Sequence, residues 1–179
     1  MKKAFTMAEA ILVMVILGII ATIMISNMKP VEFRDKGLQV LAKKVLGQID
    51  TATTQILFNN AQDSRMDKLY AAGSNTATYS FGANLTDTKV LYNTYLVGTR
   101  ENATGAWCKD RTHMMLKDGS CIAFTAAASA NTWIPGQKNP MTVTPTVGLI
   151  YVDVNDYEEP NILGKDQWLI PVGTYGIDY

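Results

Sequence analysis

An uninterrupted apolar run near the amino terminus constrains this chain more than any other feature. Between Ile11 and Ile25, ten of fifteen residues are Ile, Leu or Val, and the run contains no charged residue. The 24 residues from Phe5 to Met28 would form a helix of about 36 Å at ~1.5 Å per residue. This length is enough to cross a bilayer, so the sequence predicts a membrane-spanning helix.

A single carboxylate, Glu9, lies at the head of this run. A charged residue costs roughly +2.5 to +3.5 kcal/mol at the bilayer centre and less near an end. The aliphatic residues together contribute about −3 to −6 kcal/mol, so insertion remains favoured. Lys2 and Lys3 precede the run, and the positive-inside rule therefore places residues 1–4 in the cytoplasm. The chain after Lys29 is expected on the other side of the inner membrane.

Three interpretations of the segment compete. A secretory signal peptide would be cleaved after the run at small residues, but SNMKPVEF follows Ile25 and offers no convincing site. A plain signal anchor explains the hydrophobicity and leaves Glu9 without a role. The third interpretation takes all the features together.

Lys2-Lys3, the small residue Ala4, Phe5-Thr6, Glu9 and the long apolar helix resemble the type III signal of type IV pilins and type II secretion pseudopilins. The resemblance covers residues 2–25. It implies that a prepilin peptidase cuts on the cytoplasmic side between Ala4 and Phe5 and methylates the new amino terminus at Phe5. Gly is the commoner residue before the cut, so Ala4 departs from the usual pattern.

The same resemblance assigns a role to Glu9. After cleavage Phe5 carries an α-amino group with an unperturbed pKa of about 7.7–8.0, and Glu9 lies four residues further on the same helix face. In the family, the glutamate of an incoming subunit meets the terminal amine of a subunit already in the filament. Pairing relieves the cost of two unpaired charges in an apolar medium and fixes axial register. The open alternative is a carboxylate solvated at the membrane interface.

Beyond the membrane the helix is expected to continue to about Asn59, over a total of about 80 Å. An apolar stripe at spacings of three and four predicts an amphipathic half over residues 29–60; it comprises Leu38, Leu41, Val45, Ile49, Ala52 and Ile56. Pro30 is expected to kink or open the helix because it has no N–H to donate. Gly18 matches a glycine common in the family, so a loosened stretch between Gly18 and Pro30 is expected in the assembled filament.

Residues 61–179 are expected to form a globular α+β head with a mostly antiparallel sheet. A short helix is predicted over Ser64–Ala72 and a polar loop over residues 73–89. Asp118-Gly119 is a two-residue hairpin signal. Residues 128–146 are expected to be a long surface loop. Strands are predicted over residues 90–97, 112–117, 120–124 and 148–154.

Charge and cysteine usage narrow the function classes. The chain of 179 residues has a formal net charge of zero, and no basic field indicates nucleic-acid binding. Cys108 and Cys121 lie in the exported part, where disulfides persist. A bridge between them would contribute about 3 kcal/mol by closing a loop of roughly 14 residues; two reduced cysteines are the alternative. The family often places its disulfide nearer the carboxyl end.

No catalytic or cofactor motif occurs in the sequence, and no enzymatic activity is expected. His113 has no metal-ligating neighbour at a suitable spacing and is expected to have a structural or surface role. The glycosylation patterns at Asn84 and Asn102 are short and weak. An acidic cluster offers hard oxygen ligands for calcium, and the resemblance adds that major pseudopilins carry a calcium site in carboxyl-terminal loops. The spacing is not that of an EF-hand, and a solvated turn is the alternative; the candidates are Asp153, Asn155, Glu158, Asn161 and Asp166.

Together these features predict a pilin fold in four parts: a leader over residues 1–4, a filament-core helix over 5–28, its continuation over 29–60 and the head over 61–179. The expected function is that of a structural subunit polymerised through its apolar helix. Its expected partners are copies of itself or sister pilins, the prepilin peptidase, an inner-membrane assembly platform and the lipid bilayer, with no nucleic acid. The competing function is that of a monomeric, membrane-anchored extracytoplasmic binding domain, dependent on calcium in one version.

Overall fold

The computed structural model describes residues 7–27, 30–69, 79–96, 108, 111–156 and 158–178. These residues belong to two compact units, Met1–Arg34 and Asp35–Tyr179. The first unit contains helix α1, Met7–Asn27, and the second contains an α+β head. Ala4 and Phe5 lie outside the described residues.

Helix α1 is apolar on every side, as its sequence requires. Each residue from Met7 to Met24 is exposed in the chain. This 18-residue window has a mean hydropathy of 2.5 and is the one helix of the described chain long and apolar enough to cross a membrane. By length and composition, α1 could serve as a membrane anchor or as a signal sequence.

Helix α2 is Pro30–Asn60, and from Asp35 onwards it is the long helix of the head. The helical assignment ends at Asn27 and resumes at Pro30, and residues 28 and 29 lie outside the described part. The kink or opening predicted at Pro30 therefore stays a prediction. The predicted stripe is confirmed, because Val45, Ile49 and Ile56 are each 0% exposed.

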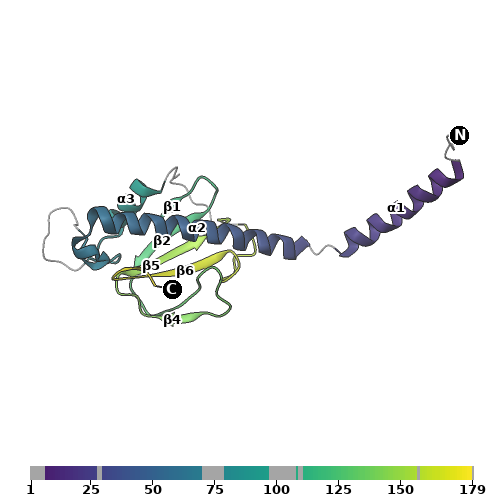
Figure 1. Ribbon diagram of the computed structural model, residues 1–179. Helices are drawn as coiled ribbons and strands as arrows, with labels where there is room; N and C mark the ends of the chain where they lie inside the picture. Colours follow the sequence, from purple (N-terminus) through teal and green to yellow (C-terminus); the bar gives the residue numbers. More distant parts are fainter. Residues whose placement is uncertain are drawn as a thin grey trace. The chain divides into compact units, whose positions relative to one another are not determined.

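A five-stranded sheet packs against α2 (Figure 1). Its order is β1-β2-β5-β6-β7 and every neighbouring pair is antiparallel. A two-stranded hairpin, β3-β4, accompanies it. The strands are β1 Thr112–Met115, β2 Cys121–Ala126, β3 Ala130–Thr132, β4 Met141–Val143, β5 Gly148–Asp153, β6 Gln167–Gly173 and β7 Gly176–Ile177.

The β1-β2 hairpin, at the edge of the sheet, lies where the sequence predicts it, but the Leu116 N–H donates to the Ser120 carbonyl oxygen, so its loop has three residues and not the predicted two. Thr112 pairs with Phe124 and Met115 with Cys121, with the turn at Asp118-Gly119, where Gly119 has φ +92°. Side chains of β2 alternate between the two faces of the sheet. Ile122 and Phe124 join the α2 core, whereas Cys121 and Ala123 join a second cluster on the other face.

Three predicted elements require correction. The strand predicted over residues 90–97 is helix α3, Leu85–Tyr95, which also takes in the end of the predicted loop 73–89. The loop predicted over residues 128–146 contains the β3-β4 hairpin. In place of a helix from Ser64, the described chain has two short 3₁₀ turns, Gln62–Ser64 and Met66–Lys68.

Candidate functional site

The strongest functional feature of the described chain is the exposed apolar surface of α1 with one acidic group near its start. Glu9 lies in the first turn of α1 and is exposed. A carboxylate in this turn interacts favourably with the partial positive charge of the helix amino terminus. The rest of the helix has no other charged residue, so Glu9 is the group on α1 that can give an apolar contact a defined axial position.

Gly18 and its surroundings form regular helix. The Thr22 hydroxyl donates to the Gly18 carbonyl oxygen at 2.7 Å. A Cβ added at Gly18 would meet no atom within 4 Å, so packing inside the described chain does not require glycine there. The loosening predicted between Gly18 and Pro30 concerned the assembled filament and stays a prediction.

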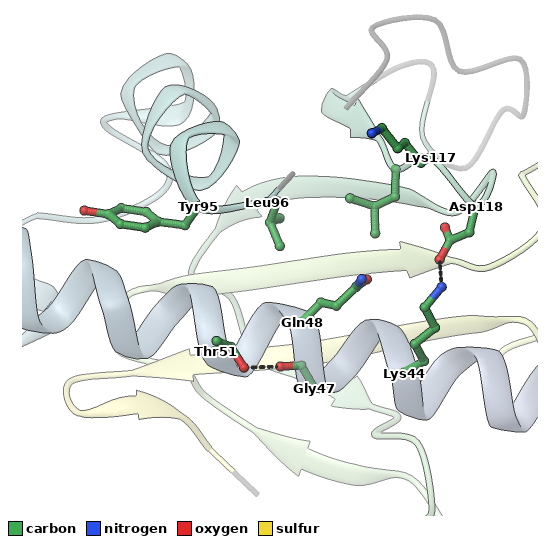
Figure 2. Close-up of a pocket in the computed structure, with 9 residues that line it drawn as sticks. Lys44, Gly47, Gln48, Thr51, Tyr95, Leu96, Lys117 and Asp118 are labelled. Carbon is green, nitrogen blue, oxygen red and sulfur yellow. Dashed lines mark hydrogen bonds and ion pairs between the residues drawn. The ribbon is translucent and has the colours of Figure 1, made fainter. Parts of the chain in front are cut away.

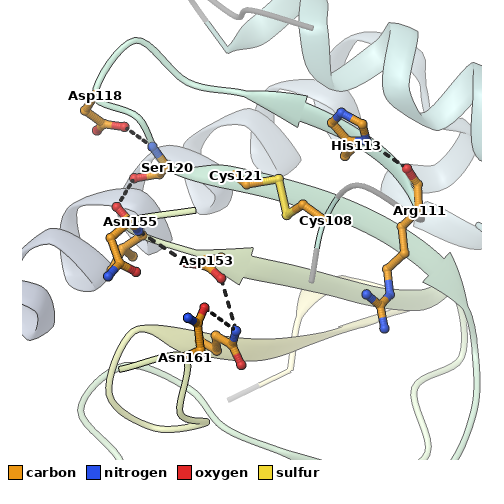
Figure 3. The surroundings of a disulfide bond; sticks show 11 residues. Cys108, Arg111, His113, Asp118, Ser120, Cys121, Asp153, Asn155 and Asn161 are labelled. Atoms are coloured by element: carbon orange, nitrogen blue, oxygen red, sulfur yellow. Dashed lines mark hydrogen bonds between the residues drawn. A yellow bond between two sulfur atoms is a disulfide. The ribbon is translucent and has the colours of Figure 1, made fainter. Parts of the chain in front are cut away.

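The head carries the disulfide foreseen from the sequence, between Cys108 and Cys121 (Figure 3). The bond attaches Cys108 to strand β2, and both sulfur atoms belong to fully buried residues. The Arg111 guanidinium lies 4.3 Å from the centre of the Tyr151 ring beside this cluster. The bond thus anchors the segment before β1 to the face of the sheet opposite α2.

His113 has a structural environment. It is half-buried, and its Nδ1 lies 2.9 Å from the Arg111 carbonyl oxygen. Within the described part of the chain, no group of three or more His, Cys, Asp or Glu side chains could hold a metal ion. Asn84, the first residue of the glycosylation pattern that the structure covers, donates its amide to the Ser80 carbonyl oxygen.

The candidate calcium ligands hold the loop after β5 together by hydrogen bonds to protein groups. The Asp166 carboxylate accepts from the backbone N–H groups of Asn161 and Ile162 at 2.6 and 2.7 Å. The Asn155 amide nitrogen donates to the Glu158 carbonyl oxygen at 2.8 Å. The Glu158 side chain is exposed. Calcium needs six to eight converging oxygen ligands, and these side chains do not supply such a set.

Asp153 is the most perturbed acidic group of this loop. It is fully buried and accepts from Gln167 Nε2 at 3.1 Å and from the Asn155 N–H at 3.2 Å (Figure 3). Burial raises the pKa of Asp153 to about 7, and the nearby charges of Asp166 and Asp156 act in the same direction. The fold therefore favours a proton on Asp153 near neutral pH.

A cavity of about 700 Å³ lies between α2, the end of α3 and the β1-β2 hairpin (Figure 2). At its edge, Lys44 Nζ and Asp118 Oδ2 form an ion pair at 2.8 Å. The sequence predicted Asp118 in a turn, but it did not predict the contact with Lys44.

Comparison of the chain with family models, with curated proteins and with solved structures finds no match. The site residues are therefore interpreted from their own chemistry. Among the described residues, that chemistry consists of an apolar helix with Glu9 in its first turn and a disulfide-bonded head.

Proposed function

We propose that this chain is the structural subunit of a type IV pilus-like filament, made as a prepilin, cut between Ala4 and Phe5, and polymerised through α1. One observation carries the proposal: α1 is exposed from Met7 to Met24, is apolar there except for Glu9, and belongs to a compact unit other than that of the head. Such a surface needs a lipid or protein environment. A bilayer supplies it before assembly, and the helices of neighbouring subunits supply it afterwards.

Glu9 gives the packed helices a register. Cleavage at Phe5 creates an ammonium group four residues before Glu9, and in an apolar medium each charge is costly without a partner of opposite sign. A pair formed between the Glu9 carboxylate of one subunit and the Phe5 amine of another satisfies both charges only at one axial offset. The head then lies outside the inner membrane, and the peptidase and an assembly platform are the membrane partners.

Mass spectrometry of the mature chain tests the processing step. We expect loss of residues 1–4 and one added methyl group on Phe5. An intact amino terminus would instead favour a monomeric, membrane-anchored binding domain. Cleavage after Ile25 would favour a secretory signal peptide, and either result would refute the proposal.

A substitution at Glu9 tests the assembly step. We expect Glu9→Ala to be inserted, cut and methylated as the wild type is, and to give few or no filaments, because the incoming subunit no longer has an acid to place against the amine. Filament yield by electron microscopy and shearing measures this. Glu158→Ala, which removes an exposed carboxylate of the head, is the matched control and should assemble normally. Wild-type yield from Glu9→Ala would contradict the pairing.

A further inference from the structure

We draw no further inference here: the strongest candidate, the solvent-facing side of α2 on which Val40 and Phe58 are exposed, is an unpartnered apolar face, and nothing in the described part of the chain shows what covers it.

Discussion

At the scale of single residues, side-chain hydroxyls link the two helices of the head. Tyr92 on α3 is fully buried, and its hydroxyl lies 2.8 Å from Thr53 Oγ1 on α2. The Thr53 hydroxyl donates to the Ile49 carbonyl oxygen at 2.8 Å, so Tyr92 is the donor to Thr53. Burial raises the pKa of Tyr92 above its usual value, which keeps this donor protonated.

This link predicts a specific cost for Thr53→Val. The change keeps the shape of the side chain but leaves the Tyr92 hydroxyl buried without an acceptor, which costs about 1–3 kcal/mol. Thr51→Val is the matched control, because the Thr51 hydroxyl makes the same helical bond, to the Gly47 carbonyl oxygen at 2.8 Å, on an exposed face. Urea unfolding of both variants measures the difference. Equal midpoints would show that the buried link contributes nothing.

Asp153 makes the stability of the head depend on pH. In the unfolded chain its pKa is near 3.8, and in the fold it is about 7, so the folded state binds the proton more tightly. The resulting stabilisation is fully present below pH 3.8 and is lost as the pH rises through about 7. We expect the melting temperature of the wild type to fall between pH 5 and pH 8, and that of Asp153→Asn to fall less. Glu159→Gln, at an exposed site, should behave as the wild type, and parallel curves for all three would exclude Asp153 as the cause.

At the scale of elements, close packing between strand β5 and the segment before α3 demands glycine at position 148. A Cβ added to Gly148 would lie 2.7 Å from Phe81 Cβ. The Phe81 ring in turn packs edge-to-face on Tyr79, Tyr92 and Phe124. Phe81 therefore cannot move away without disturbing the aromatic core.

Two glycine substitutions should have opposite effects. Gly148→Ala is expected to destabilise the head by about 1–3 kcal/mol through overpacking. Gly47→Ala in α2 is expected to stabilise it by about 0.5–1 kcal/mol, because an added Cβ meets no atom within 4 Å. Thermal unfolding measures both. A Gly148→Ala variant as stable as the wild type would contradict the packing described for β5.

The elements that the sequence predicted incorrectly show where local patterns mislead. Residues 90–97 are rich in aliphatic and aromatic residues, which favour strands. The buried positions Thr88, Tyr92 and Leu96 lie four residues apart, which is the spacing of a helix. This spacing becomes visible only when the stretch of sequence under consideration begins before residue 90. The predicted loop over residues 73–89 included Thr88 and so separated it from Tyr92 and Leu96.

Strand β6 was not predicted from the sequence. Pro171, which lies within the strand, makes it hard to recognise. A proline within a run normally excludes a central strand, because it cannot donate to the ladder. In the fold, the carbonyl oxygen of Pro171 faces the β7 side and accepts from the Asp178 N–H at 3.0 Å. The N–H that Pro171 lacks would have pointed to the same side, opposite Asp178, just beyond Ile177, where β7 ends. The hydrogen bonds between β6 and β5 are therefore not affected.

At the scale of the whole molecule, the described part of the head has a hydrophobic core of its own. Its buried members begin at Ala42 and continue to Val172. The head therefore has its own hydrophobic core, as an independent folding unit requires.

A truncated chain tests this independence. We expect residues 30–179 to be soluble without detergent, to form the Cys108–Cys121 bond and to unfold cooperatively at the midpoint of the head in the full chain. Circular dichroism and thiol titration measure these properties. An aggregated or unfolded product would show that the head depends on α1. The full chain, kept in detergent, is the matched reference.

The sequence predicted the chemical role of single residues better than it predicted which residues contact one another. Glu9, the apolar run and the two cysteines are local signals that a reader of the sequence can find. The contacts of Tyr92 with Thr53 and of Lys44 with Asp118 join residues more than 30 positions apart. Such contacts depend on how distant elements pack, and no local pattern in this chain encodes that packing.

The uniform apolarity of α1 has a consequence for how a subunit would leave the bilayer. Beyond Glu9, no side of the helix differs much from any other, so its apolar part has no preferred rotation about its own axis towards its surroundings. Lipid acyl chains on one side of the helix can be exchanged for neighbouring protein while those on the opposite side stay in place. The helix can then leave the bilayer by stepwise replacement of lipid by protein, and at no stage does it have to pass through water.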